Sequence, residues 1–200
     1  MLNRHPGTAL ALTAFVLLFA ASCARRSEGT AEPAAPAAAA PASAAAASSK
    51  PPIGLSGGAP SIDALLDQFL AALEQKDTQA LERLRLTKEE YTQIVMPGTV
   101  TKGQPPLQTF EKANDVAWGL LNARSHYTLE AMISGYGGRH YVKRQLEFSE
   151  SPPREYAWYI AYGGTRLTLW DEQGEAHELS TGWIADVDGS HKFIGFNRSD

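Results

Sequence analysis

The stretch Val187-Asp188-Gly189-Ser190-His191-Lys192-Phe193-Ile194-Gly195-Phe196 decides how the second half of this chain folds. Asp-Gly is a strong two-residue hairpin signal, because the tight turn that joins two twisted strands needs a positive φ at both central positions. The segments on either side, residues 175–187 and 191–197, are predicted as antiparallel strands. The first is long for one strand and is expected to bend at Gly182.

Further strands are predicted upstream of this hairpin. The alternation of apolar and other residues has the period of a half-buried strand. The predicted segments are residues 127–133, 139–148, 156–162 and 165–170. Short turns are expected between them, at residues 135–138, at Ser151-Pro152-Pro153 and at Gly163-Gly164. Five or six consecutive strands joined in this way predict an antiparallel meander.

Helices are predicted before these strands. Ser61 is expected to cap a helix whose apolar residues recur at helical spacing, and Asp77 a second, shorter one. Thr87-Lys88-Glu89-Glu90 matches a capping box and opens a third helix, expected to end before Pro97-Gly98. A fourth is expected over residues 105–124. Helices followed by strands predict an α+β fold with helices packed on one face of the sheet.

This order of elements, together with the terminal hairpin, resembles the nuclear-transport-factor-2-like superfamily, also called SnoaL-like or cystatin-like. The resemblance covers most of residues 61–200 and includes no catalytic motif. It implies N-terminal helices packed on a curved antiparallel sheet of five or six strands, with a cone-shaped pocket between them. Members range from enzymes to binding modules, so the resemblance does not decide function.

The beginning of the chain has the layout of a secretory signal. Arg4 and His5 precede an apolar run, and small residues lead to Cys23. The run is shorter than the ~20 residues that cross a bilayer. A cleaved signal over residues 1–22 is therefore predicted in place of a permanent membrane span.

Two ways of processing this signal fit the sequence. In ordinary secretion, cleavage follows a small residue such as Ala21. In lipoprotein processing, Cys23 becomes the first residue, and this would explain a lone cysteine in an exported chain. Ala21-Ser22-Cys23 resembles the bacterial lipobox, although Ala20 stands where a branched aliphatic residue is usual. The resemblance implies acyl chains such as palmitate on Cys23. Because Ala24 and not Asp follows, it also implies the outer membrane, facing the periplasm or the cell surface.

Residues 23–60 are predicted to form a disordered linker between this anchor and a single domain over residues 61–200. Ala, Pro and Ser dominate the linker, and its prolines interrupt any helix that the alanines would favour. The stretch has too few large apolar side chains to offset the entropy of ordering it. A tether of this kind holds the domain clear of the membrane.

Charge and motifs exclude several classes of function. Residues 61–200 contain 14 Lys and Arg against 20 Asp and Glu, without a basic patch, so nucleic acid is not an expected partner. The sequence contains no nucleophile elbow, phosphate loop or zinc-binding helix motif. The histidines after the signal, which are His126, His140, His177 and His191, are expected on different strands without metal-ligand spacing. We therefore predict no cofactor and no metal.

The acidic run at residues 171–175 is predicted to be a solvated hairpin tip. It lacks the alternating oxygen ligands and the closing Glu of a calcium-binding loop.

One set of residues suggests a ligand pocket. His140 and Arg144 share a face of their predicted strand with apolar side chains. If that face is inward, the guanidinium needs a carboxylate or an acceptor-rich ligand, because an unpaired buried charge is very costly. The candidate walls of such a pocket for an anionic or polar small molecule are Tyr91, Trp118 and Trp158. The alternative is that Arg144 pairs with a helix carboxylate, or that both residues are solvated.

Together these features predict a membrane-anchored envelope lipoprotein, not an enzyme, whose domain binds a small ligand or a protein partner. The alternative is a SnoaL-like enzyme that carries out acid–base chemistry in the cone, with His140 or His126 beside a carboxylate. A third interpretation is a structural element of an envelope assembly, which would present a large apolar patch.

Overall fold

The structure is a computed structural model that describes residues 50–197. The predicted signal over residues 1–22, the lipidation site Cys23 and the linker up to residue 49 lie outside the described residues.

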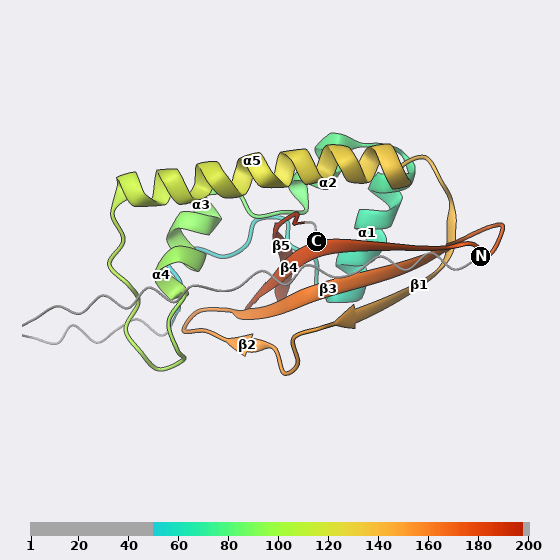
Figure 1. The fold of residues 1–200 in the computed structure, drawn as a ribbon. Helices are drawn as coiled ribbons and strands as arrows, with labels where there is room; N and C mark the ends of the chain where they lie inside the picture. Colours follow the sequence, from blue (N-terminus) through green and yellow to red (C-terminus); the bar gives the residue numbers. More distant parts are fainter. Residues whose placement is uncertain (1–49, 198–200) are drawn as a thin grey trace, which may run out of the picture. The chain divides into compact units, whose positions relative to one another are not determined.

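The described residues form an α+β fold with an open antiparallel sheet of five strands (Figure 1). The helices are α1 (Ile62–Glu74), α2 (Thr78–Arg83), α3 (Lys88–Glu90), the π-helical turn η1 (Tyr91–Val95), α4 (Met96–Gly98) and α5 (Glu111–Tyr136). The strands are β1 (Tyr141–Phe148), β2 (Arg154–Glu155), β3 (Ile160–Asp171), β4 (Ala176–Val187) and β5 (Ser190–Gly195). The strand order is β1-β3-β4-β5, and the short β2 pairs with β3. The sheet is antiparallel as predicted, but it is not a simple meander, because β1 and β2 both pair with β3.

The first three helix starts lie where the sequence predicts them, whereas the fourth helix, predicted over residues 105–124, begins only at Glu111. The Ser61 side chain accepts a hydrogen bond from the Ala64 N–H at 3.1 Å, and Asp77 accepts one from the Ala80 N–H at 2.9 Å. Thr87 and Glu90 form the predicted capping box, in which each side chain accepts from the other residue's N–H. These caps satisfy donors that have no partner within the helix.

The predicted end of the third helix is wrong. Helical structure continues from α3 through η1 into α4, which contains Pro97 and Gly98. Pro97 has no N–H to donate to the preceding helical turn, and the helical segment ends one residue later, at Gly98. The Met96 N–H donates to the Tyr91 carbonyl five residues earlier, which is the π-helical pattern.

The predicted strand over residues 127–133 is also wrong, because α5 continues to Tyr136. The buried residues of this segment are Ser125, Thr128, Leu129 and Met132. Their spacing of three, one and three residues marks one helical face, whereas Tyr127 is 73% exposed. The apparent alternation was part of a helical period.

A single strand, β3, replaces the two strands predicted around Gly163-Gly164. The glycines do not form a turn but an irregularity in the pairing of β3 with β4, between Tyr162 and Thr165. Gly164 has a φ of +63°, and a Cβ on Gly163 would lie 2.6 Å from the Trp183 ring. Glycine therefore permits both the backbone twist and the close packing here.

The terminal hairpin is confirmed. Asp188 and Gly189 have φ values of 51° and 82°, as the tight turn requires. Gly182, where a bend was expected, has a φ of 87° and pairs with Thr165 beside an irregularity of the ladder.

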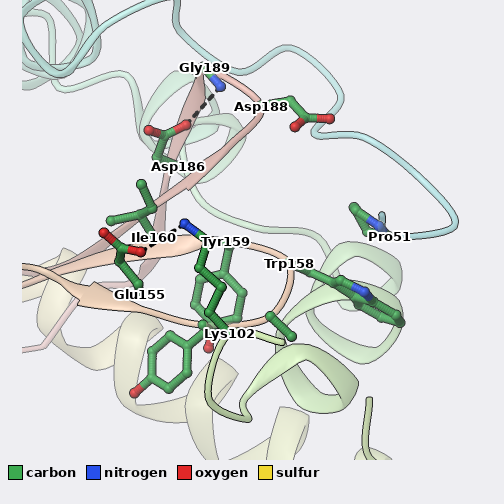
Figure 2. A pocket seen from close by; sticks show the side chains of 11 residues that line it. Pro51, Lys102, Glu155, Trp158, Tyr159, Ile160, Asp186, Asp188 and Gly189 are labelled. Carbon is green, nitrogen blue, oxygen red and sulfur yellow. Dashed lines mark hydrogen bonds and ion pairs between the residues drawn. The ribbon is translucent and has the colours of Figure 1, made fainter. Parts of the chain in front are cut away.

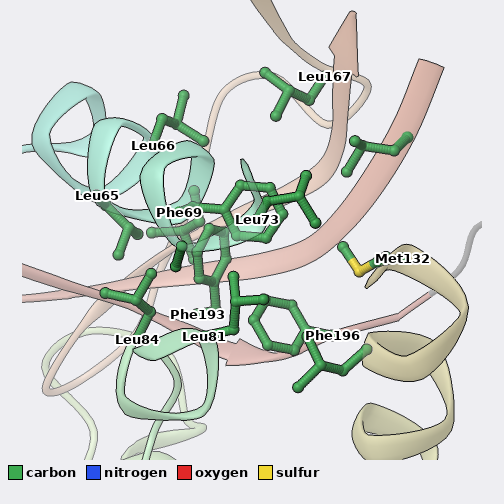
Figure 3. Packing of buried hydrophobic residues seen from close by; sticks show 14 of the residues in the cluster. Leu65, Leu66, Phe69, Leu73, Leu81, Leu84, Met132, Leu167, Phe193 and Phe196 are labelled. Atoms are coloured by element: carbon green, nitrogen blue, oxygen red, sulfur yellow. The ribbon is translucent and has the colours of Figure 1, made fainter. Parts of the chain in front are cut away.

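The main core lies where α1, α2 and α5 meet β3, β4 and β5 (Figure 3). Phe69 of α1 contacts Phe193 of β5 with ring centroids 5.6 Å apart, and Phe193 lies 5.3 Å from Phe196. Leu129 and Met132 bring the second half of α5 into the same cluster. In the described part of the chain, we find no helix with the length and apolar character to cross a membrane.

Two segments outside the strands cover the outer edge of β5. Ala59 exchanges two backbone hydrogen bonds with His191, at 2.9 and 2.8 Å. Further along, the Leu86 N–H donates to the Phe193 carbonyl and the Phe193 N–H donates to the Leu84 carbonyl. These contacts satisfy backbone groups that an open edge would leave unpaired.

Candidate ligand-binding cleft

A cleft of about 730 Å³ lies beside the covered edge of β5. Its walls come from the segment before α1, from α2, from residues 84–87, from α5 and from β5. The lining residues include Ala80, Glu82, Arg83, Leu84, Arg85, Leu86, Trp118 and Lys192. A concave, partly apolar site with a few polar groups is the usual form of a small-molecule site.

The backbone of residues 84–86 fixes the direction of the Arg85 side chain. These residues are extended along β5 through their two hydrogen bonds with Phe193. Successive side chains of an extended segment point to opposite sides. Leu84 belongs to the main core, and Arg85 lines the cleft.

Arg85 is a buried cation with incomplete pairing. The residue is 7% exposed; its Nε donates to Glu82 Oε2 at 2.7 Å, and its Nη2 donates to Asn122 Oδ1 at 2.5 Å. The third nitrogen, Nη1, is buried and has no hydrogen-bond partner among residues 50–197. A buried donor without an acceptor costs about 1–3 kcal/mol, and more when it is charged. An acceptor from a ligand would remove this penalty if the side chains that cover Nη1 move aside, since the atom is itself buried.

One of the predicted pocket walls, Trp118, lines this cleft, and Tyr91 packs against its ring. The Arg85 guanidinium carbon is 5.7 Å from the Trp118 ring centroid, within cation–π range. The centroids of the Tyr91 and Trp118 rings lie 5.7 Å apart. Burial raises the pKa of the Tyr91 hydroxyl, which keeps this wall uncharged.

Lys192, another cation of the cleft lining, forms a fully buried ion pair. Lys192 Nζ lies 3.0 and 3.2 Å from the two oxygens of Glu90, and both side chains are at most 3% exposed. Glu90 also accepts from the N–H groups of Ser56 and Thr87. This ion pair holds three segments of the fold together. The other two cations of the lining are Arg83, which is exposed, and Arg85, which is buried.

Arg144 and His140 lie elsewhere, on or near β1. Arg144 forms ion pairs with Asp67 and, at 3.3 Å, with Asp63, both on α1, as the alternative interpretation expected. His140 is exposed, and its Nδ1 lies 3.2 Å from Glu74. The five predicted residues therefore do not form one pocket.

Trp158 lines a separate, smaller hollow of about 270 Å³ (Figure 2). Its charged groups are paired: Lys102 donates to Glu155 at 2.9 Å, and Asp186 accepts from the Gly189 N–H at 2.8 Å. Burial raises the pKa of Tyr159, at the base of the hollow, to about 12, and its hydroxyl bonds to Thr99. The hollow offers no buried donor in need of a partner.

Comparisons with protein-family models, with curated proteins and with solved structures give no match to this chain. The function is therefore argued from the geometry alone.

The sequence contains a local signal for the direction of the Arg85 side chain. Leu84-Arg85-Leu86 is a short alternation after a helix that ends without a glycine. Such a triplet points one side chain away from two apolar neighbours. The triplet does not reveal the partners of the guanidinium. Asn122, 37 residues later, accepts a hydrogen bond from Nη2 only, and Nη1 has no partner in the described structure.

Proposed function

We propose that this protein is an exported lipoprotein whose folded unit binds a small anionic or acceptor-rich molecule in the cleft beside Arg85. The observation that carries the ligand-binding part is the buried Arg85 guanidinium, whose Nη1 has no partner in the described structure. The Trp118 ring suits a ligand with a flat apolar body next to its acidic group. Aromatic carboxylates and aryl phosphates have this chemistry.

The anchor is the second part of the proposal. A signal over residues 1–22, Cys23 lipidated with chains such as palmitate, and a linker up to residue 60 would hold the domain at a bacterial membrane. Two or more acyl chains give stable anchoring, where a single chain binds only marginally. The outer membrane is the proposed location because Ala24, and not Asp, follows the cysteine.

The finer description of the fold also belongs to this proposal. We infer a curved sheet with the helices on one face, of the nuclear-transport-factor-2-like kind. In support, α1, α2 and α5 share one core with β3, β4 and β5. A fold of this kind could also bind another protein of the bacterial envelope in place of a small molecule.

Intact mass of the full chain expressed in a bacterial host tests the anchor. Loss of residues 1–22 with added acyl chains is expected for wild type and not for Cys23→Ala. A wild-type mass with simple cleavage and a free thiol would remove the anchor from the proposal and leave the cleft untouched.

Thermal shift with benzoate, naphthoate and phenyl phosphate tests the cleft. We expect wild type to be stabilised by at least one of these probes and Arg85→Gln to respond to none. Arg144→Gln is the matched control, because Arg144 is an ion-paired arginine far from the cleft in sequence and contacts. Equal responses of wild type and Arg85→Gln would refute the proposed site.

The alternative, an acid–base enzyme that uses His126 or His140, stays a prediction. His126 lies on α5 and is 59% exposed, 3.3 Å from Glu130. His140 is 62% exposed beside Glu74. Neither lines the Arg85 cleft, so the binding function is the one that we develop.

A further inference from the structure

A second group of side chains converges at the β3–β4 hairpin, away from the Arg85 cleft. Asp171 ends β3, Glu175 lies in the turn and His177 is the second residue of β4. Each offers one metal-ligating atom, and the three atoms lie within 4.8 Å of one another. His177 Nε2 and Asp171 Oδ2 are 2.8 Å apart.

The turn holds the Asp171 carboxylate rigidly and leaves one oxygen for a ligand. Its Oδ1 accepts from the N–H groups of Gln173 and Glu175, at 3.1 and 2.9 Å. Gly174 supplies the positive φ, 79°, that the turn needs. Oδ2 therefore faces His177 from a fixed position, at a side chain only 9% exposed.

The imidazole is held as firmly as the carboxylate. The Tyr136 and Tyr141 rings meet the His177 ring edge-on, with centroids 6.5 and 6.1 Å away. The His177 side chain is 16% exposed. Ligands fixed by their own packing lose little entropy when they bind a metal.

We propose that Asp171, Glu175 and His177 bind a first-row divalent cation, with Zn²⁺ the best fit. One imidazole nitrogen and two carboxylate oxygens suit zinc and its neighbours, whereas calcium and magnesium prefer oxygen alone. Two ligands about 2.0–2.1 Å from a tetrahedral Zn²⁺ are about 3.3 Å apart, so the Asp171–His177 separation needs to widen only slightly.

The surroundings provide room and further donors. Asp171 and Glu175 also line a hollow of about 430 Å³ together with His140, which leaves space for a water or a fourth ligand. Arg139 is the cation that opposes metal binding, since its Nη1 lies 3.3 Å from His177 Nε2. Its side chain is exposed and can swing into solvent.

Titration of the purified, chelator-treated full chain with Zn²⁺ by calorimetry tests this site. Visible absorption of added Co²⁺, which is sensitive to tetrahedral coordination, gives an independent readout. We expect saturable binding by wild type and about a tenfold or greater loss of affinity in Glu175→Gln and His177→Gln. His177→Gln keeps an amide donor for Asp171, and Glu175 is exposed, so both variants are expected to fold.

Glu147→Gln is the control, since it removes an exposed carboxylate of β1 that lies outside both the ligand group and this hollow, and its affinity should equal that of wild type. Thermal midpoints without metal verify that each variant is folded. Absence of saturable Zn²⁺ binding by wild type, or wild-type affinity in folded Glu175→Gln, would overturn the proposal. The Asp171–His177 contact would then be an internal hydrogen bond only.

Discussion

Replacing Lys192 with methionine should destabilise this fold more than any exposed charge change, because it leaves the Glu90 carboxylate buried without a cation. The two side chains are 2% and 3% exposed. Breaking a buried pair by removing one partner typically costs about 3–5 kcal/mol. Two N–H groups, from Ser56 and Thr87, remain on the carboxylate at 2.6 and 2.7 Å. We therefore expect a loss near the lower end, about 3 kcal/mol.

Urea denaturation followed by tryptophan fluorescence measures this loss, and thermal unfolding should show a fall of roughly 6–12 °C. The double variant Glu90→Gln/Lys192→Met should be more stable than Lys192→Met alone, because it removes the stranded charge. Lys102→Met is the control: it breaks an exposed pair with Glu155 and should change stability by less than about 1 kcal/mol. A Lys192→Met protein as stable as this control would refute the reasoning. So would a double variant whose loss of stability equals the sum of the losses in Lys192→Met and Glu90→Gln measured separately.

Three further changes test other parts of the structure. The raised pKa of Tyr159, about 12 against 10.0, means that its stability contribution is complete well below pH 10 and falls by about 2–3 kcal/mol as the pH rises to 12. About half of this loss, roughly 1.4 kcal/mol, is expected between pH 8 and pH 11. The fall in stability from urea denaturation at these two pH values should therefore be larger in wild type than in Tyr159→Phe, where the raised pKa of Tyr91 still contributes, and an equal fall in both would contradict this prediction. Gly163→Ala should cost about 1–3 kcal/mol, since its Cβ would lie 2.6 Å from the Trp183 ring, and a neutral effect in the same denaturation assay would show that the ring moves freely. Thr87→Ala should cost about 1 kcal/mol through loss of the capping box, and an unchanged midpoint would mean that Glu90 alone holds this helix start.

The local signals in the sequence were sufficient where short-range chemistry decides the structure. Ser61, Asp77 and Thr87 were identified as caps because their partners lie three residues away. Asp188-Gly189 was identified because its turn needs a backbone that only a few residues adopt.

Contacts between residues far apart in the sequence determine two of the features that were predicted wrongly, the end of α5 and the continuity of β3. The end of α5 follows from Leu129 and Met132 entering the core beside α1 and β3, and no pattern within residues 127–133 contains that information. Gly163-Gly164 has the composition of a turn, but Trp183 and pairing with β4 keep β3 continuous.

The same limit applies to the candidate sites. Tyr91, Trp118 and Trp158 were predicted as walls of a ligand pocket beside Arg144, but the guanidinium next to Trp118 is that of Arg85. The periodicity of the sequence does not show that Arg144 pairs with carboxylates of α1, nor that one nitrogen of Arg85 has no partner in the described structure.

The cover on the β5 edge also determines how the domain would respond to mechanical load. A pulling force that reaches residue 50 along the chain is opposed first by the Lys50–Asp188 contact and by the Ser56 N–H bound to Glu90. It is opposed next by the two hydrogen bonds between Ala59 and His191. All of these precede Ser61, so they must give way before tension reaches the start of α1 and the core behind it. If the domain is tethered to a membrane through residues 1–49, these contacts would break first under tension and so protect the core from unfolding.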